Sequence, residues 1–155
     1  MHSAFKEFAD SLHPSFERLM ACEPFTASTI PRGCAKQGIY LFSEGELHQY
    51  VGRTRQFVKR MGQHSRPGSQ QNQAVFAFRL AREATGRIHA SYGGEWTRLG
   101  LCQDETFSNA FTAAKSRVRN MDLRFVEETD PLRQALLEIY VSVVLQTPYN
   151  DFNTH

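Results

Sequence analysis

Apolar side chains alternate with others along two short stretches on either side of Gly45. The alternation runs through 38–42 and resumes through 47–51, and both stretches are rich in aromatic and branched residues. A period of two with this composition is typical of β-strands. Residues 43–46 supply a polar turn between them, so the pattern predicts a β-hairpin over 38–51.

The hydrophobic pattern also predicts how the two strands pair. If Ile39 and Val51 share the buried face, the loop contains an odd number of residues and Tyr40 lies directly opposite Tyr50. A two-residue loop at 44–45 would instead turn the two tyrosines to opposite faces. The apolar pattern favours the first register, in which the second strand ends at Gly52.

Apolar spacings of three and four predict helices over much of the remaining chain. These are a helix over 1–22 that Pro14 breaks into two, a helix from a Thr54 cap to His64, one over 73–84, one that starts after Asp104 or Thr106 and runs to Met121, and one over 131–145. Residues 123–126 are expected to form a third strand, and 88–102 to be extended or irregular. The N-terminal helix is expected to cover the sheet; contact with a second copy or a partner is the alternative.

The predicted fold class is α/β (α+β), with a three-stranded, mainly antiparallel sheet flanked by helices. A chain of 155 residues suits one domain over 1–155. Within it, 1–35 form an N-terminal helical extension and 65–120 an insertion-bearing middle segment. No pair of cysteines is spaced like a zinc ligand pair, so neither a zinc site nor a disulfide framework is expected.

The composition favours a protein of the cytoplasm. Charged residues make up 22% of the chain, and the apolar run at 139–145 is too short to span a bilayer. Lys6, Glu7 and Asp10 interrupt any apolar core of a signal peptide. We therefore expect a cytoplasmic location and no membrane partner.

The basic residues are concentrated in one part of the chain. Residues 51–100 contain nine basic and two acidic residues, whereas 125–155 contain one basic and five acidic. This asymmetry is typical of a phosphate-binding face, and a solvated arginine-rich surface explains it equally well. The candidates for contact with DNA are Arg53, Arg55, Lys59, Arg66, Arg79, Arg82, Arg87, Arg98 and Trp96.

Two tripeptides stand out in the predicted hairpin, Gly38-Ile39-Tyr40 and Tyr50-Val51-Gly52. They are followed by Arg60, ten residues after the second tyrosine, and His64 on the same helical face; near the C-terminus come Glu138 in the run 135–141 and Asn150 after Pro148. In these features the sequence resembles the GIY-YIG nucleases, with valine in place of the usual isoleucine in the second tripeptide. The resemblance covers 36–64 and roughly 120–153.

The resemblance implies a DNA endonuclease that leaves 5′-phosphate and 3′-hydroxyl ends. Glu138 would hold one divalent cation, Mg²⁺ or in its place Mn²⁺, and no organic cofactor is implied. Tyr40 would act as general base or position the nucleophile, with cationic help from Arg60 and His64, and Tyr50 would line the same pocket. Arg60 would also clamp the phosphate, whereas Gly38, Gly52 and Asn150 would support the site.

Each of these residues also has an ordinary structural explanation. Tyr40 and Tyr50 suit half-buried strand positions, and a salt bridge to an arginine would explain Glu138 as well as a metal does. The alternative function is a DNA-binding or protein-interaction module that keeps the fold without cutting. For an enzyme, both a site-specific homodimer and a structure-specific nuclease remain open.

Overall fold

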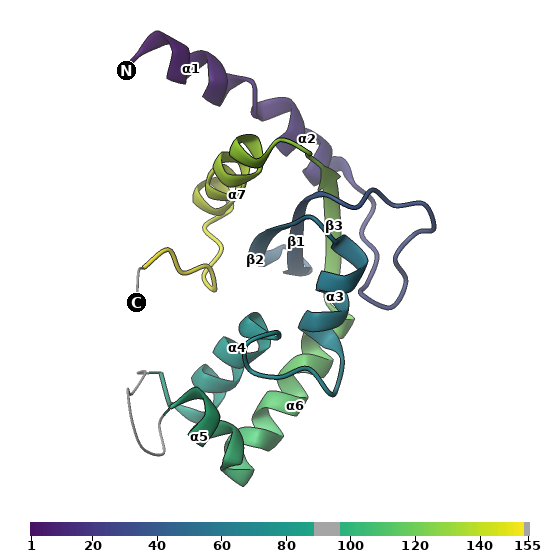
Figure 1. Cartoon of the computed structure of the whole chain (residues 1–155), viewed down its shortest axis with the longest axis vertical. Helices are drawn as coiled ribbons and strands as arrows, with labels where there is room; N and C mark the ends of the chain where they lie inside the picture. Colours follow the sequence, from purple (N-terminus) through teal and green to yellow (C-terminus); the bar gives the residue numbers. More distant parts are fainter. Residues whose placement is uncertain (89–96, 154–155) are drawn as a thin grey trace. The chain divides into compact units, whose positions relative to one another are not determined.

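The computed structural model describes residues 1–88 and 97–153, which form two compact units. The first unit comprises Met1–Val58 and Asp122–His155, and the second comprises Lys59–Met121. Figure 1 shows the sheet in the first unit and the helices of the second. The second unit nearly coincides with the middle segment predicted over 65–120, and begins six residues earlier.

The first unit is built on the predicted three-stranded antiparallel sheet. Its strands are β1 (Gly38–Glu44), β2 (Leu47–Thr54) and β3 (Asp122–Glu127), in the order β2-β1-β3. β1 therefore lies in the centre and β2 forms one edge. The α/β fold class and the sheet are confirmed. The prediction that β2 ends at Gly52 is wrong, because residues 52–54 continue the ladder opposite 38–40.

The register of the hairpin differs from the prediction. Tyr40 lies opposite Gly52 and Phe42 lies opposite Tyr50, so the direct pairing of Tyr40 with Tyr50 is wrong. Residues directly opposite each other project from the same face, and so do residues two apart in a strand. Tyr40 and Tyr50 therefore still share a face, as diagonal neighbours.

A β-bulge explains this outcome. The loop has two residues, 45–46, and Gly45 adopts a φ of +60°, which favours glycine. A two-residue loop alone would turn the tyrosines to opposite faces. The register shifts between Phe42 and Ser43, where β2 contains one additional residue, and this shift returns Tyr50 to the face of Tyr40.

The two faces of the sheet have different covers. Ile39, Leu41 and Val51 lie on one face, where they form a core with two helices, α2 (His13–Ala21) and α7 (Pro131–Leu145). The apolar side chains that complete this core are Leu12, Leu19, Val126, Leu137 and Val141. The other face carries aromatic residues: Phe57, at the start of α3 (Phe57–Ser65), stacks on Phe125 at 4.0 Å between ring centroids.

The N-terminal helix is broken near Pro14, as predicted. Its first part, α1 (Ser3–Asp10), buries no residue, whereas α2 buries Leu19 and contacts β1 and β3. The predicted cover of the sheet is thus provided by α2 and not by α1 (Figure 1). α7 has the predicted bounds, because the Asp130 side chain caps its first turn and Pro131 needs no hydrogen-bond acceptor there.

Among its described residues, the second unit contains three helices besides most of α3. They are α4 (Val75–Thr85), α5 (Arg98–Gln103) and α6 (Glu105–Asn120), and α4 packs on α6 through Phe78, Phe107 and Phe111. Gly86 ends α4 and Asp104 caps α6, as predicted. The irregular structure predicted for 88–102 is wrong where α5 forms; residues 89–96, with Trp96, lie outside the described residues.

A buried cation fixes the loop between α3 and α4. Lys115, on α6, donates its Nζ to the carbonyl oxygens of Pro67 and Ser69 and lies 4.4 Å from the centroid of the Phe111 ring. These contacts satisfy the ammonium group of a residue that is only 5% exposed. Within the described part of the chain, no helix is long and apolar enough to cross a membrane.

Gly38 offers a test of how tightly β1 is held against β3. A Cβ at this position would overlap the carbonyl oxygen of Val126 and lie 2.9 Å from Cζ of Phe125. Because the obstacle is backbone, we expect Gly38→Ala to lower the free energy of unfolding by about 3 kcal/mol, the upper end of ordinary overpacking. Urea denaturation measures this change.

Gly68→Ala is the matched control, since a Cβ at Gly68 meets nothing within 4 Å. We expect this variant to unfold within about 0.5 kcal/mol of the wild type. Equal stability of the two variants would mean that β1 and β3 separate easily at Gly38.

Candidate active site

Two tyrosines lie together on the aromatic face of the sheet. The ring centroids of Tyr40 and Tyr50 are 6.3 Å apart, and the Tyr40 ring also lies 5.8 Å from Phe42 and 6.5 Å from Phe57. Tyr40 is 1% exposed, whereas Tyr50 is half-buried. The central strand thus holds Tyr40 rigidly, and the edge strand carries the more accessible phenol.

The glycine of the second tripeptide makes room for the tyrosine of the first. Tyr40 lies directly opposite Gly52, and its ring extends across the glycine. A Cβ on Gly52 would overlap Oη and Cζ of Tyr40 and lie 2.9 Å from its Cε2. Any larger residue at position 52 would therefore displace the phenol.

Glu138 forms an ion pair with Arg53, the residue after Gly52. Its Oε2 lies 3.2 Å from Nε of Arg53, and the Glu138 side chain is 20% exposed. Burial raises the pKa of Glu138 above its ordinary value, and the Arg53 guanidinium offsets part of that rise. The salt bridge that the sequence left open as an explanation for Glu138 is thus present.

The ion pair belongs to the opposite face from the phenols. Arg53 pairs with Ile39 in the ladder, and both therefore project from the face that α7 covers. Tyr40 and Tyr50 project from the other face. The structure therefore brings together the two phenols, and separately the acid and Arg53, with β2 as the strand that contributes to both groups.

Asn150 braces the outer edge of β2. Its Oδ1 accepts the Val51 N–H at 2.9 Å, and its Nδ2 donates to the Val51 carbonyl at 2.7 Å. Thr147 donates its hydroxyl to the same Oδ1, and the Tyr149 N–H donates to the carbonyl of Gln49. The side-chain amide thus replaces a missing neighbouring strand and protects the edge.

The second unit carries Arg60 and His64 on α3. Arg60 donates Nη1 to Oε1 of Gln63 at 3.1 Å and to the carbonyl of Gln73 at 3.0 Å. His64 is fully buried; burial, and secondly the Arg60 charge, hold its pKa well below the ordinary value. A neutral imidazole near pH 7 supplies no positive charge, which leaves Arg60 as the cation of this pair.

The predicted DNA contacts differ in their surroundings. Arg55, Lys59 and Arg66 are exposed, and Arg53 is half-exposed in its ion pair. Arg79, Arg82 and Arg98 lie in the second unit. Sequence reasoning did not find that Arg53 is the partner of Glu138, because 85 positions separate them and no local pattern joins them.

The chemistry of Glu138 fits a divalent cation of the magnesium type. Mg²⁺ usually takes one or two protein carboxylates and completes its octahedron with water and phosphate oxygens. Glu138 provides one such carboxylate, and Arg53 competes for it. Among the described residues, no group of three or more His, Cys, Asp or Glu side chains is arranged to hold a metal.

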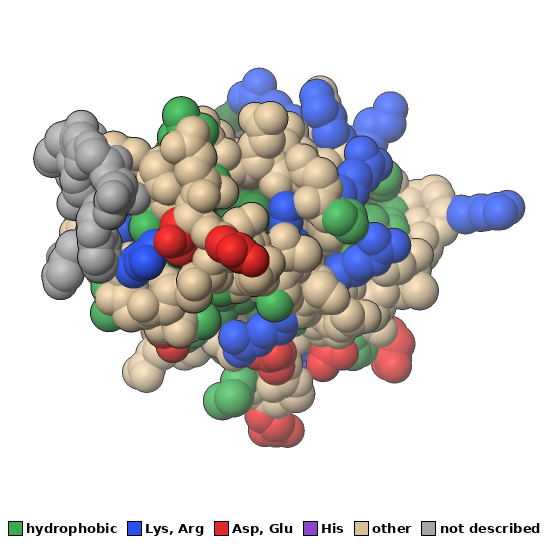
Figure 2. Space-filling model, turned by 90° about the horizontal axis from the view of Figure 1, so that it is seen from below, with side chains coloured by type: hydrophobic (Ala, Val, Ile, Leu, Met, Phe, Trp, Pro, Cys, Tyr) green, Lys and Arg blue, Asp and Glu red, His purple; other side chains and the backbone are tan. Residues whose placement is uncertain are grey.

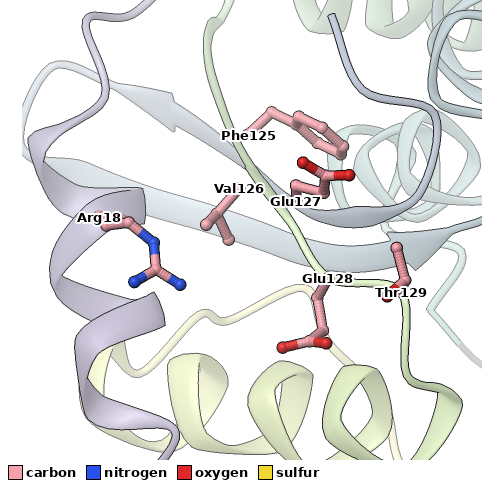
Figure 3. Close-up of a pocket in the computed structure, with 6 residues that line it drawn as sticks. All are labelled: Arg18, Phe125, Val126, Glu127, Glu128 and Thr129. Atoms are coloured by element: carbon pink, nitrogen blue, oxygen red, sulfur yellow. The ribbon is translucent and has the colours of Figure 1, made fainter.

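An open pocket of about 580 Å³ lies at the C-terminal end of β3. It is lined by Arg18 and residues 125–129, and Figure 3 shows the Arg18 side chain projecting from α2 towards it. None of the predicted site residues lines this pocket. It is therefore not assigned to the candidate site.

Comparisons with protein-family models, curated proteins and solved structures find no match for this chain.

The packing of Tyr40 on Gly52 predicts the effect of a single methyl group. We expect Gly52→Ala to lower the free energy of unfolding by about 1–3 kcal/mol, because the buried ring must move. Near-UV circular dichroism of the tyrosines should change as well. Gly68→Ala again serves as control, and an unaltered tyrosine spectrum in Gly52→Ala would contradict the packing.

The raised pKa of Glu138 predicts how stability depends on pH. A carboxyl group whose pKa is higher in the folded state binds more protons in that state. Its contribution to the stability of the folded protein is therefore complete below the unfolded pKa of about 4.3, and is lost as the pH rises through the folded pKa. Arg53→Met removes the offsetting charge, so we expect a larger loss of stability in this window. Urea denaturation from acidic to neutral pH measures it.

Glu138→Gln provides the control for that measurement. This change should abolish the additional loss that Arg53→Met produces, since no carboxyl group remains at position 138 to titrate. If Arg53→Met alters the pH dependence equally in the Glu138→Gln background, the effect does not arise from the ion pair.

Proposed function

We propose that this chain is a metal-dependent DNA endonuclease of the GIY-YIG type. It hydrolyses phosphodiester bonds and leaves 5′-phosphate and 3′-hydroxyl ends. The observation that carries the proposal is the packing of Tyr40 on Gly52, because it couples the two tripeptides of the resemblance. The tyrosine of one tripeptide requires the glycine of the other, and both phenols project from one face.

Phosphodiester cleavage requires an aligned nucleophile and neutralisation of the charge that develops on the phosphoryl oxygens. By the resemblance, Tyr40 would accept the proton of the attacking water as a phenolate or would position the nucleophile, and Tyr50, the more accessible phenol, would orient that water. Because Tyr40 is 1% exposed, the role of base requires its hydroxyl to become accessible when DNA binds. A phenol of ordinary pKa near 10 needs a neighbouring positive charge for this role. The resemblance assigns to Arg60 both this charge and the binding of the phosphate through its planar guanidinium.

By the resemblance, Glu138 would hold the metal ion, although its carboxylate lies with Arg53 on the face of the sheet opposite the two phenols. A bound Mg²⁺ or Mn²⁺ would neutralise charge on the phosphate and the departing oxygen. Arg53 favours the ionised form of the half-buried carboxylate, since a positive charge at 3.2 Å opposes part of the rise in pKa that burial causes. Asn150 keeps β2 in place while the chemistry occurs.

The Arg53–Glu138 ion pair also supports a second candidate function. It satisfies the carboxylate without a metal, as expected of a DNA-binding or protein-interaction module that does not cut. The two candidates differ in whether the chain cuts DNA and, if it does, in whether cutting requires Glu138. The nuclease proposal further includes a cytoplasmic location and, for cutting both strands, a homodimer, because one site cuts one strand.

Digestion of duplex, nicked, flap and junction DNA by the wild type and Glu138→Ala tests the proposal. We expect the wild type to cut with Mg²⁺ or Mn²⁺ and to stop with chelator. The variant should still bind DNA but cut more than about 100-fold more slowly, as when charge stabilisation is removed from an active site. Gel electrophoresis of end-labelled substrates measures the rates.

Glu46→Ala is the matched control, since Glu46 is an exposed carboxylate in the hairpin loop. It should cut as fast as the wild type. Equal cutting by Glu138→Ala would remove Glu138 from the mechanism. DNA binding by the wild type without cleavage in either metal would favour the non-catalytic module.

A further inference from the structure

The two units carry opposite net charge. Residues 59–121 contain ten basic and four acidic residues, whereas the remainder of the chain contains eight basic and twelve acidic. The helical unit is therefore positive by six charges and the sheet unit negative by four. A polyanion would be attracted to the helical unit. Figure 2 shows one face of the molecule, on which Lys and Arg side chains appear at many points with Asp and Glu side chains among them.

Two arginines of the second unit stack on one buried aromatic ring. The guanidinium carbons of Arg82, on α4, and Arg98, at the start of α5, lie 5.0 and 4.8 Å from the centroid of Phe78. Phe78 is 1% exposed and belongs to the aromatic core between α4 and α6. A buried aromatic core therefore positions both guanidinium groups.

Backbone carbonyl groups hold both arginines in place. Arg82 donates Nη1 to the carbonyl of Ile88, and Arg98 donates Nη2 to that of Gln71, each at 3.2 Å. Each guanidinium has five N–H donors, so one such bond fixes its orientation and leaves most donors for a ligand. Fixed planar donors are suited to phosphate oxygens.

Several positive charges lie close together around Phe78. Burial and, secondly, the charge of Arg98 lower the pKa of Arg82, whereas burial and then Arg79 lower the pKa of Arg98. Among the described residues, no Asp or Glu forms an ion pair with Arg82 or Arg98; Asp104 instead pairs with Arg87 at 3.0 Å. Three neighbouring positive groups repel one another, and a bound anion relieves that repulsion.

We infer that Arg82 and Arg98, with Arg79 beside them, form a phosphate-binding cluster through which the second unit holds the backbone of double-stranded DNA. The inference rests on the proposed function for the choice of DNA, and adds a site to the residues expected to carry out cleavage. Contacts to phosphates bear no base information, so the cluster provides affinity and not sequence preference.

The test compares two double variants of the full chain that remove the same charge. Arg82→Gln/Arg98→Gln alters the cluster, and Arg117→Gln/Arg119→Gln alters two exposed arginines of α6. Fluorescence anisotropy with a labelled duplex, in chelator to prevent cutting, gives the affinity at several salt concentrations between about 50 and 200 mM. Thermal melting shows whether each variant is folded.

We expect the cluster variant to bind duplex DNA more weakly than the wild type does. The loss of affinity should be similar for duplexes of different sequence. The slope of log affinity against log salt should fall by about two, since each lost phosphate contact removes about one. The α6 variant should change the slope by less than one. If the cluster variant melts below the assay temperature, Arg82→Gln and Arg98→Gln singly should each lower the slope by about one.

Equal slopes in the two double variants would overturn the cluster, because net charge alone would then explain binding. Tighter binding of single-stranded RNA than of duplex DNA by the wild type would overturn the choice of partner. Absence of DNA binding by the wild type would instead contradict the proposed function. A wild type that cuts DNA and a cluster variant with unaltered binding would refute the cluster alone.

Discussion

The contact between Tyr40 and Gly52 sets the geometry on which the candidate site depends. The ring crosses from the central strand over the edge strand and lies where a side chain at position 52 would otherwise be. This arrangement requires the observed register, since a shift of one residue would turn Tyr40 away from Gly52. The bulge between Phe42 and Ser43 then decides the face of Tyr50. Backbone pairing and side-chain chemistry are therefore inseparable in this hairpin.

β2 connects the two groups of polar residues in the first unit. As an edge strand it needs protection, and Asn150 supplies it by bonding both backbone groups of Val51. Successive residues of β2 project from opposite faces of the sheet. Tyr50 lies on the aromatic face, and Arg53 lies on the other face, where it forms an ion pair with Glu138 of α7. The ion pair compensates in part for the burial of the acid, and a metal ion proposed at Glu138 would have to compete with it. Its strength would thus influence how readily Glu138 takes up a cation.

The division into two units separates two physical tasks. The sheet unit is acidic and orders its polar groups through backbone pairing, whereas the helical unit is basic and holds two of its arginines, Arg82 and Arg98, on an aromatic core. Lys115 illustrates the same principle, because its ammonium group is held by carbonyl oxygens and an aromatic ring and not by a carboxylate. Positive charges held without carboxylates retain their attraction for external anions.

The sequence by itself determined most of the helices and strands, because their signals are local. The alternation of apolar and other residues predicted the hairpin. Asp130-Pro131 predicted the start of α7, and Gly86 predicted the end of α4. The resemblance supplied the site residues, and the shared face of the two tyrosines followed from the apolar pattern although the pairing did not. Only the tertiary structure decided the bulge, the short helix α5 and the Arg53–Glu138 pair. These depend on contacts between residues far apart in the chain, for which no periodic pattern exists, and on the shape of a packed core.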